Sequence, residues 1–216
     1  MRASELVWSK RRRSASGLVG GALSCALAFA CNKSQSPGSE PGISPPVASV
    51  GAAVTAPAAN AAAEPGTLLA PGAPLPDLTA TAQTGEVVKL GELKGKLVVV
   101  YFYPKDDTPG CTIEAQEIRD LWQELQKTGA LVLGVSSDDE VSHKAFAEKH
   151  ALPFLLLPDP EHRIAQAFGV PLNNGRARRT SFVFGRDGRL AKVFPSVTPK
   201  GHGRELLESL QALASR

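Results

Sequence analysis

The region from residue 74 onward predicts an α/β fold, with a mixed central sheet and helices on both of its faces. Short runs of β-branched, leucine and aromatic residues, typical of buried strands, alternate with helical patterns. Two further apolar runs form a hairpin before a last helix, which adds antiparallel strands to the sheet. The expected strands are 97–103, 130–135, 154–157, 180–184 and 190–194.

Turn residues indicate two hairpins. Asp187-Gly188 separates the last two strands, and Asp-Gly between apolar runs is a hairpin signal. Near the start of the region, Gly85 lies between the apolar segments 75–78 and 86–90. Glycine is a common turn residue, so an initial strand or hairpin is expected there.

Four helices are expected between and after these strands, at 109–127, 139–150, 161–168 and 203–214. In the first, apolar residues recur at helical spacing and form a stripe that faces the core. The stripe consists of Ala115, Ile118, Trp122 and Leu125. Cys111 falls on the same stripe, so its sulfur should point toward the body of the protein. Gly129 ends the helix.

Residues 1–31 have the composition of an export signal. Five basic residues against Glu5 give them a net charge of +4, and since the whole chain carries +3, residues 32–216 carry −1. The apolar residues 18–30 follow the basic cluster and are too few to span a bilayer as a helix. The basic excess belongs to the leader, and we predict no nucleic-acid binding from it.

Cys31 ends this leader and indicates where the protein resides. Ala30-Cys31 resembles a bacterial lipoprotein cleavage site, at which the cysteine becomes the lipidated first residue. We therefore expect an exported protein of the periplasm or cell envelope, anchored to a membrane through Cys31. Ordinary signal-peptidase cleavage, with Cys31 incidental, is the alternative, and Ala22-Leu-Ser-Cys25 is a competing site.

Residues 32–73 predict a disordered tether. They are rich in Ala, Pro, Ser and Gly, and they hold too few large apolar residues to build a core. As a flexible chain, this segment would span about 30–40 Å. The expected organisation is a signal peptide (1–31), a tether (32–73) and one folded domain (74–216).

The segment that follows the strand 97–103 carries the chemistry: Pro104-Lys-Asp-Asp-Thr108-Pro-Gly-Cys111. Thr108 is a good helix N-cap, and Pro109 is favoured at the first helical position. Cys111 then lies in the first turn, where free N–H groups and the helix dipole favour a thiolate, the nucleophilic form. The pattern predicts an activated cysteine; a buried core cysteine is the alternative.

This pattern, P-x-x-x-T-x-x-C, resembles the active-site signature of peroxiredoxins. The string from Phe102 to Thr112 is similar to the bacterioferritin-comigratory protein / peroxiredoxin Q branch, and the likeness continues through Arg179-Thr-Ser-Phe-Val183. The resemblance implies a thioredoxin-like fold. It also implies an antioxidant thiol peroxidase that reduces hydrogen peroxide and organic hydroperoxides in cell redox homeostasis, often as a monomer.

The resemblance assigns roles to four residues. Cys111 would attack the peroxide and become a sulfenic acid. Thr108 would hydrogen-bond the thiolate and the incoming peroxide, and Pro104 would pack over the sulfur. Arg179 would stabilise the thiolate and polarise the peroxide, with Arg178 as the alternative arginine.

One departure from the family pattern concerns the second half of the cycle. Many members of this branch carry a second cysteine five residues after the first, and here that position is Gln116. No further cysteine occurs in residues 112–216. We therefore expect a one-cysteine cycle, in which an external small thiol or a thioredoxin-like protein reduces the sulfenic acid through a mixed disulfide.

The remaining polar residues predict neither a metal nor a cofactor. The four histidines show no metal-ligand spacing. His143 and His150 are expected on a solvated or half-buried helix face, and His202 receives no role. The acid pairs Asp106-Asp107 and Asp138-Asp139 are interpreted as caps and loops.

Two other functions fit part of the sequence. A thiol–disulfide oxidoreductase on the same fold would need Cys-x-x-Cys, and Thr108 stands where its first cysteine belongs. Arg179-Thr180 also replaces the proline that thioredoxins place before the corresponding strand. A non-catalytic thioredoxin-like module on a lipid tether fits the missing second cysteine, but not the retained Pro104, Thr108, Cys111 and Arg179.

Overall fold

The protein is described here by a computed structural model that covers residues 66–215. The predicted signal peptide, Cys31 and the tether up to residue 65 lie outside the described residues. The sequence analysis placed the start of the folded region at residue 74, but the structure shows that it begins earlier. Leu69 is buried in the core, and its N–H donates to the carbonyl of Phe168 at 3.1 Å.

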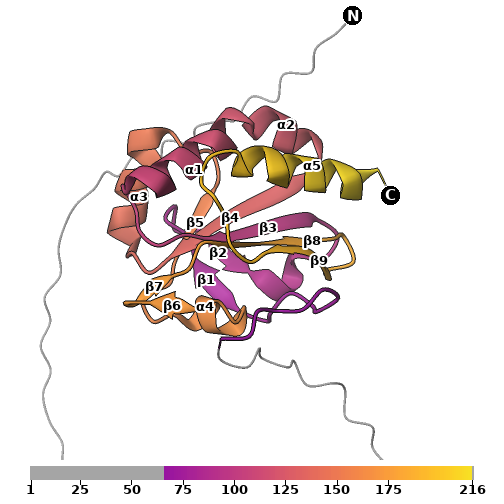
Figure 1. Cartoon of the computed structure of the whole chain (residues 1–216), viewed down its shortest axis with the longest axis horizontal. Helices are drawn as coiled ribbons and strands as arrows, with labels where there is room; N and C mark the ends of the chain where they lie inside the picture. The colour runs from indigo at the N-terminus through magenta and orange to yellow at the C-terminus, as the bar shows by residue number, and fades with distance from the viewer. Residues whose placement is uncertain (1–65, 216) are drawn as a thin grey trace, which may run out of the picture. The chain divides into compact units, whose positions relative to one another are not determined.

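A five-stranded mixed sheet forms the centre of the domain, in the order β5-β4-β3-β8-β9 (Figure 1). β3 pairs in parallel with β4, and β4 with β5, while β8 and β9 are antiparallel additions. The strands are β3 (Leu97–Phe102), β4 (Ala130–Ser136), β5 (Leu155–Pro158), β8 (Thr180–Phe184) and β9 (Leu190–Phe194). This confirms the predicted mixed sheet with its terminal hairpin.

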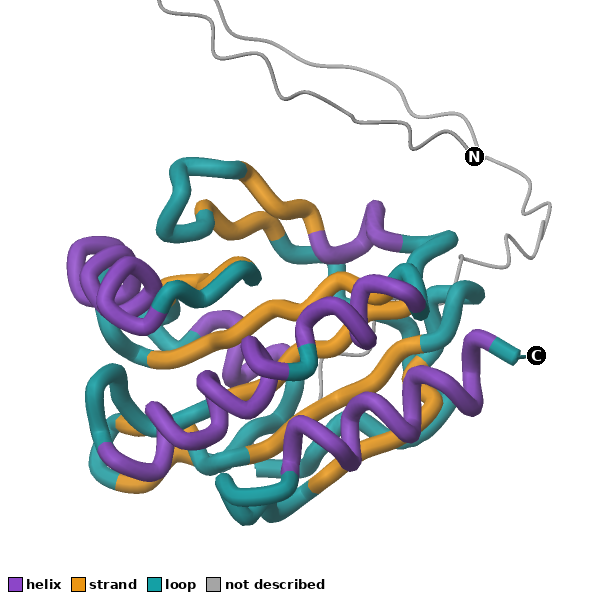
Figure 2. Tube along the Cα trace, turned by 90° about the horizontal axis from the view of Figure 1, so that it is seen from above, coloured by secondary structure: helices purple, strands orange, loops and turns teal. Residues whose placement is uncertain are grey.

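Helices lie on both faces of this sheet, as predicted. One face carries α1, α2, α3 and α5, and Figure 2 shows the strands running side by side beneath them. The other face carries α4 and two small hairpins. The helices are α1 (Pro109–Asp120), α2 (Trp122–Lys127), α3 (Glu140–His150), α4 (Arg163–Ala167) and α5 (His202–Ala214).

The sheet divides the apolar core into two clusters. All six residues of β3 are buried, because successive side chains of this central strand point to opposite covered faces. Val98 and Val100 pack in the cluster under α4, while Val99 and Tyr101 pack in the cluster under α1, α3 and α5. Cys111 belongs to the second cluster.

Two local predictions were wrong. The helix expected over 109–127 is two helices, because the backbone of Leu121 leaves helical geometry at φ −93° and ψ 7°. The first strand is β1 (Thr79–Thr81), which pairs with β2 (Val87–Lys89), rather than 75–78. The earlier segment contains Pro76 and follows Pro74, and proline cannot donate to a strand ladder.

Two short elements were not predicted. A 3₁₀ helix, η1 (Leu90–Leu93), follows the first hairpin. The hairpin β6 (Leu172–Asn173) and β7 (Arg176–Ala177) turns at Asn174-Gly175, where φ is 50° and 70°. Asn-Gly tolerates this left-handed geometry, so the dipeptide was the available signal.

Gln83 closes the outer edge of β5. Its side-chain amide donates to the carbonyl of Phe154 at 3.2 Å, and its side-chain oxygen accepts from the N–H of Leu156 at 2.7 Å. Its own backbone N–H donates to the carbonyl of Leu156 at 3.0 Å. The side chain therefore satisfies backbone groups that an edge strand otherwise leaves open.

Candidate active site

Cys111 lies at the junction that the sequence predicted, in the first turn of α1 directly after β3 and its following loop. Thr108 is the N-cap residue in extended geometry (φ −80°, ψ 147°), and Pro109 is the first helical residue. The cysteine is free and only 2% exposed. Its sulfur thus sits beside the helix N-terminus, where the unpaired N–H groups and the dipole favour negative charge.

Arg179 is the arginine that reaches this sulfur. Its Nη2 lies 3.2 Å from Cys111 Sγ. Arg179 directly precedes β8, and the pairing of Thr180 with Phe102 brings it to the end of β3 from which the cysteine loop departs. Arg178 and Arg176 are exposed, which separates them from the buried sulfur.

Glu114 completes this cluster and was not identified from the sequence. It lies three residues after Cys111 on the buried side of α1, and its Oε2 accepts a hydrogen bond from Arg179 Nη1. The guanidinium is therefore shared between a carboxylate and the sulfur. An acid on the apolar stripe of the helix, between Cys111 and Ala115, was the signal that pointed to it.

The carboxylate of Glu114 is poorly satisfied. The residue is fully buried, and its Oε1 has no hydrogen-bond partner among residues 66–215. Burial raises the pKa of Glu114 to about 7, against the opposing attraction of Arg179. The negative charge that holds Arg179 is thus near its titration midpoint at neutral pH.

Thr108 does not contact the sulfur in the way that we expected. Its hydroxyl donates to the backbone carbonyl of Lys105 at 3.0 Å, and it makes no side-chain cap bond to α1. Because the single hydroxyl proton is used in this bond, the oxygen offers only lone pairs to a bound molecule. Pro104, like Thr108, is half-buried, and it begins the loop that ends at Thr108.

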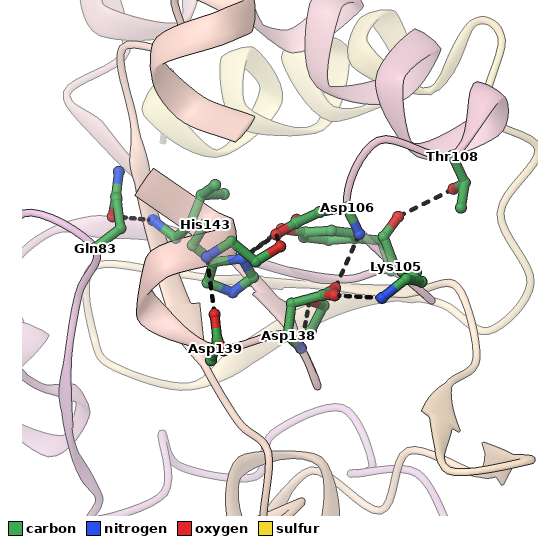
Figure 3. A network of polar contacts seen from close by, with 11 residues as sticks. Gln83, Lys105, Asp106, Thr108, Asp138, Asp139 and His143 are labelled. Atoms are coloured by element: carbon green, nitrogen blue, oxygen red, sulfur yellow. Dashed lines mark hydrogen bonds and ion pairs between the residues drawn. The ribbon is translucent and has the colours of Figure 1, made fainter. Parts of the chain in front are cut away.

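The loop of residues 104–108 is anchored to Asp138, which follows β4 (Figure 3). Lys105 Nζ lies 3.0 Å from Asp138 Oδ1, and the backbone N–H of Asp106 donates to Asp138 Oδ2 at 2.9 Å. Ser136 Oγ donates to the same Oδ2 at 2.7 Å. Although burial opposes it, these hydrogen bonds hold the pKa of Asp138 below its usual value.

A second anchor joins the loop to α3 through Asp106. This buried carboxylate accepts from the Tyr103 hydroxyl at 2.7 Å, and from Ser142 Oγ at 2.7 Å. His143 Nδ1 lies 2.8 Å from Asp106 Oδ2. The expectation that His143 lies on a solvated or half-buried face was wrong, since it is completely buried. Asp106, which was interpreted only as a cap or loop residue, also connects the loop to α3.

Gln116, which stands where the family resemblance led us to look for a second cysteine, joins α1 to α3. Its Nε2 lies 3.3 Å from His150 Nδ1, and His150 Nε2 lies 2.9 Å from Asp107 Oδ1. Lys149 Nζ donates to the same Asp107 oxygen at 2.9 Å. Asp107 has a left-handed backbone (φ 54°), so these contacts hold a strained residue of the loop of residues 104–108.

His202, to which the sequence assigned no role, lies behind β8 at the start of α5. Its Nε2 is 2.9 Å from Ser181 Oγ, and its Nδ1 is 3.0 Å from Glu205 Oε2. Burial lowers the pKa of this imidazole. In the described part of the chain, no three His, Cys, Asp or Glu side chains cluster as they would around a metal ion.

A family model identified as "AhpC/TSA family" matches residues 71–193. The chain belongs to this family. Peroxiredoxin Bcp from Bacillus subtilis is 43% identical over 152 residues, a match that covers 67% of this chain and 97% of that protein. The protein is therefore a peroxiredoxin, which is a thiol peroxidase.

Solved structures agree with this assignment. Peroxiredoxin Q from Xanthomonas campestris is 33% identical, with a TM-score of 0.62, over 65% of this chain and 96% of that one. The bacterioferritin comigratory protein of the same organism, whose alkyl peroxide reduction activity has been studied structurally, gives 33% identity and a TM-score of 0.61, over the same 65% and 96%. The thioredoxin-like fold and the branch expected from the motifs are thus confirmed.

The four residues that the peroxiredoxin resemblance singled out differ in how they relate to the sulfur. Cys111 and Arg179 are in direct contact. Pro104 and Thr108 belong to the adjoining loop, and Thr108 is bonded to the loop backbone rather than to the sulfur. Two further residues were not predicted to belong to the site: Glu114, which binds Arg179, and Asp106, which joins the loop to α3.

Proposed function

We propose that this peroxiredoxin reduces hydrogen peroxide and organic hydroperoxides through Cys111. The observation that carries the proposal is the 3.2 Å contact between Arg179 Nη2 and Cys111 Sγ at the N-terminus of α1. A fixed cation and helix N–H groups together favour the thiolate, which is the nucleophilic form. The alkyl peroxide reduction activity of the Xanthomonas relative supports the wider substrate range.

The chemical step transfers one oxygen atom to the sulfur. The Cys111 thiolate attacks the terminal oxygen of the peroxide, an S–O bond forms, and the O–O bond breaks. Cys111 becomes a sulfenic acid, and the departing hydroxide or alkoxide takes a proton and leaves as water or alcohol. Arg179 stabilises the charge that moves from sulfur to the leaving oxygen, which is a preorganised electrostatic effect.

Thr108 and Pro104 would act on the peroxide from the loop. The Thr108 oxygen has only lone pairs free, so it accepts a hydrogen bond from the hydroperoxide O–H and orients the substrate. Pro104 carries no N–H and shields the sulfur from water. Of the two roles expected for Thr108, this assignment keeps the hydrogen bond to the peroxide and drops the one to the thiolate.

The sulfenic acid would be reduced by an external thiol. Cys111 has no partner cysteine in residues 112–216, and Gln116 occupies the usual position of one. One thiol would displace water to form a mixed disulfide, and a second would release Cys111 as a thiol. The 2% exposure of the cysteine favours a small thiol over a bulky protein partner.

The same proposal includes export and membrane anchoring. The basic and apolar pattern of residues 1–31 supports a signal peptide, and Ala30-Cys31 supports lipidation in the periplasm or cell envelope. We propose that the domain works there as a monomer. A Cys31→Ser variant should move from the membrane fraction to the soluble fraction, and continued membrane association would contradict lipidation at Cys31.

The central test is peroxide consumption with dithiothreitol as the reductant. Wild type should consume hydrogen peroxide and an organic hydroperoxide, and Cys111→Ser should lose both activities. Mass spectrometry of peroxide-treated protein should locate the added oxygen, or a mixed disulfide, on Cys111. Equal rates for wild type and Cys111→Ser would favour a non-catalytic module instead.

A further inference from the structure

We propose that Asp106 and His143 are positioning residues for peroxide reduction, which fix the loop of residues 104–108 so that Thr108 meets the substrate. This inference rests on the proposed function of Cys111. Neither residue touches the sulfur, and the two belong to different elements, the loop of residues 104–108 and α3. Figure 3 shows their contact beside the anchors of Lys105 and Thr108.

The Asp106–His143 pair is buried and specifically bonded. His143 is fully buried and Asp106 is only 6% exposed, so both groups are largely shielded from bulk water. A buried carboxylate is costly unless donors surround it. Asp106 receives three, from the Tyr103 hydroxyl, Ser142 Oγ and His143 Nδ1, at 2.7, 2.7 and 2.8 Å. Two of these three donors come from the first turn of α3.

The bonding partners define which atoms carry protons. Burial raises the pKa of Tyr103 well above its usual value, so its phenol keeps its proton and donates to Asp106. His143 Nε2 has no partner within the described residues. Nδ1 faces the carboxyl group of Asp106 and is the ring atom that donates to it. His143 therefore holds Asp106 through a single fixed donor.

A short path leads from this pair to the substrate position. The backbone N–H of Asp106 donates to Asp138, and the preceding Lys105 carbonyl accepts from the Thr108 hydroxyl at 3.0 Å. Asp107, which lies between Asp106 and Thr108 in the sequence, has a left-handed backbone, so the chain turns sharply there. A shift of the Asp106 side chain would move the Lys105 carbonyl and turn the Thr108 oxygen away from the peroxide.

Loss of this anchor should act on peroxide chemistry more than on the sulfur itself. Arg179 and the N-terminus of α1 surround Cys111 independently of His143. A misplacement of about 1 Å can cost on the order of 100-fold in rate when groups must be aligned. Removal of His143 should therefore slow oxidation by peroxide and leave the reactivity of the thiolate toward other electrophiles nearly unchanged.

The experiment compares two reactions of Cys111 in the full chain. The rate constants for oxidation by hydrogen peroxide and for alkylation by iodoacetamide are measured by quenching and mass spectrometry of the Cys111 peptide. In His143→Ala we expect the peroxide rate to fall about 10- to 100-fold. The alkylation rate should stay within about threefold of wild type, so the ratio of the two rates should fall at least about threefold.

Three further variants sharpen the comparison. His143→Asn keeps a side-chain N–H near the position of Nδ1 and should recover part of the peroxide rate. Ser142→Ala removes one donor with little change in volume, and it carries the test if His143→Ala does not fold. Asp159→Asn is the matched control, because this buried carboxylate accepts from backbone N–H groups at the start of α4, those of Ile164 and Ala165 among them, and its side chain has no hydrogen bond to the 104–108 loop within the described residues.

Each outcome decides the inference. A peroxide-to-alkylation ratio that falls in His143→Ala or Ser142→Ala, but not in Asp159→Asn, supports it. A ratio that stays at the wild-type value, or that falls equally in Asp159→Asn, overturns it, since both results describe a structural role alone. Failure of the proposed function is a separate result, because wild-type Cys111 would then react with peroxide no faster than a free thiol.

Discussion

Two buried carboxylates flank Cys111, and they are satisfied very differently. Glu114, three residues after the cysteine, has Arg179 as partner for one oxygen and no partner for the other within residues 66–215. Asp106, five residues before it, has both oxygens bonded by three donors. The first is bound to the group that touches sulfur, whereas the second is bound to the frame of the loop.

This difference shows that the site combines a carboxylate whose charge changes with pH, Glu114, with one that holds the loop in a fixed geometry, Asp106. A carboxylate that lacks a donor keeps a raised pKa, which for Glu114 is about 7, so its charge and its hold on Arg179 change near neutral pH. A carboxylate with three donors keeps its geometry. Variants on the Glu114 side should therefore alter electrostatics, whereas variants on the Asp106 side should alter placement.

Arg179→Met should produce the largest effect. The variant removes the cation that faces the sulfur and leaves Glu114 buried without its partner. Loss of a preorganised donor commonly costs about 100- to 1000-fold in rate. Stopped-flow oxidation by hydrogen peroxide measures this loss, and iodoacetamide alkylation should fall with it, unlike in His143→Ala. A near-wild-type peroxide rate would mean that a different arginine acts.

Glu114→Ala should have a smaller effect of the same kind, with a loss of about 10-fold in peroxide rate. Without the carboxylate, the guanidinium loses the group that aligns it, although it stays near the sulfur. The matched variant Glu114→Gln keeps an oxygen that can accept from Arg179 Nη1. Its peroxide rate should therefore fall less than that of Glu114→Ala, by no more than the loss of one hydrogen bond to a charged group would cause. If Gln and Ala behave alike, alignment of Arg179 does not depend on Glu114.

A separate effect on the Glu114 side should appear in the pH dependence of stability rather than in the reaction rate. The folded-state pKa of Glu114, about 7, lies above its unfolded value of 4.5. The folded form thus binds the extra proton between these limits, and stability falls as pH rises through the interval, by on the order of 1 kcal/mol per pH unit. Above about pH 7 this contribution levels off.

The contribution of Glu114 to the pH dependence of stability is measured by urea unfolding of wild type and Glu114→Gln at pH 5 and pH 8. The stability difference between the two proteins should shift in favour of the variant at the higher pH. Because every other titrating group is common to both, a constant difference would contradict the raised pKa.

Much of the fold could be predicted from periodicity and turn chemistry. The runs of β3, β4 and β8 are buried on both faces, which produces continuous apolar segments that are easy to recognise. The break at Leu121 could not be predicted, because no proline or glycine marks it.

The site could be predicted only where a motif fixed it. The strand-to-helix junction placed Cys111, and the family string placed Arg179. His143 and Asp106 are 37 residues apart, and nothing in either local sequence indicates that they meet. Buried polar pairs of this kind arise from tertiary packing, so the periodic pattern of α3 assigned His143 to the wrong face.

One glutamine has a consequence far from the active site. Amyloid-like growth needs a sheet margin whose amides and carbonyls are vacant, and the outer margin of β5 is occupied at Phe154 and Leu156 by Gln83. An incoming chain would first have to evict that side chain. At these two residues of β5, strand addition would therefore compete with hydrogen bonds that Gln83 already makes.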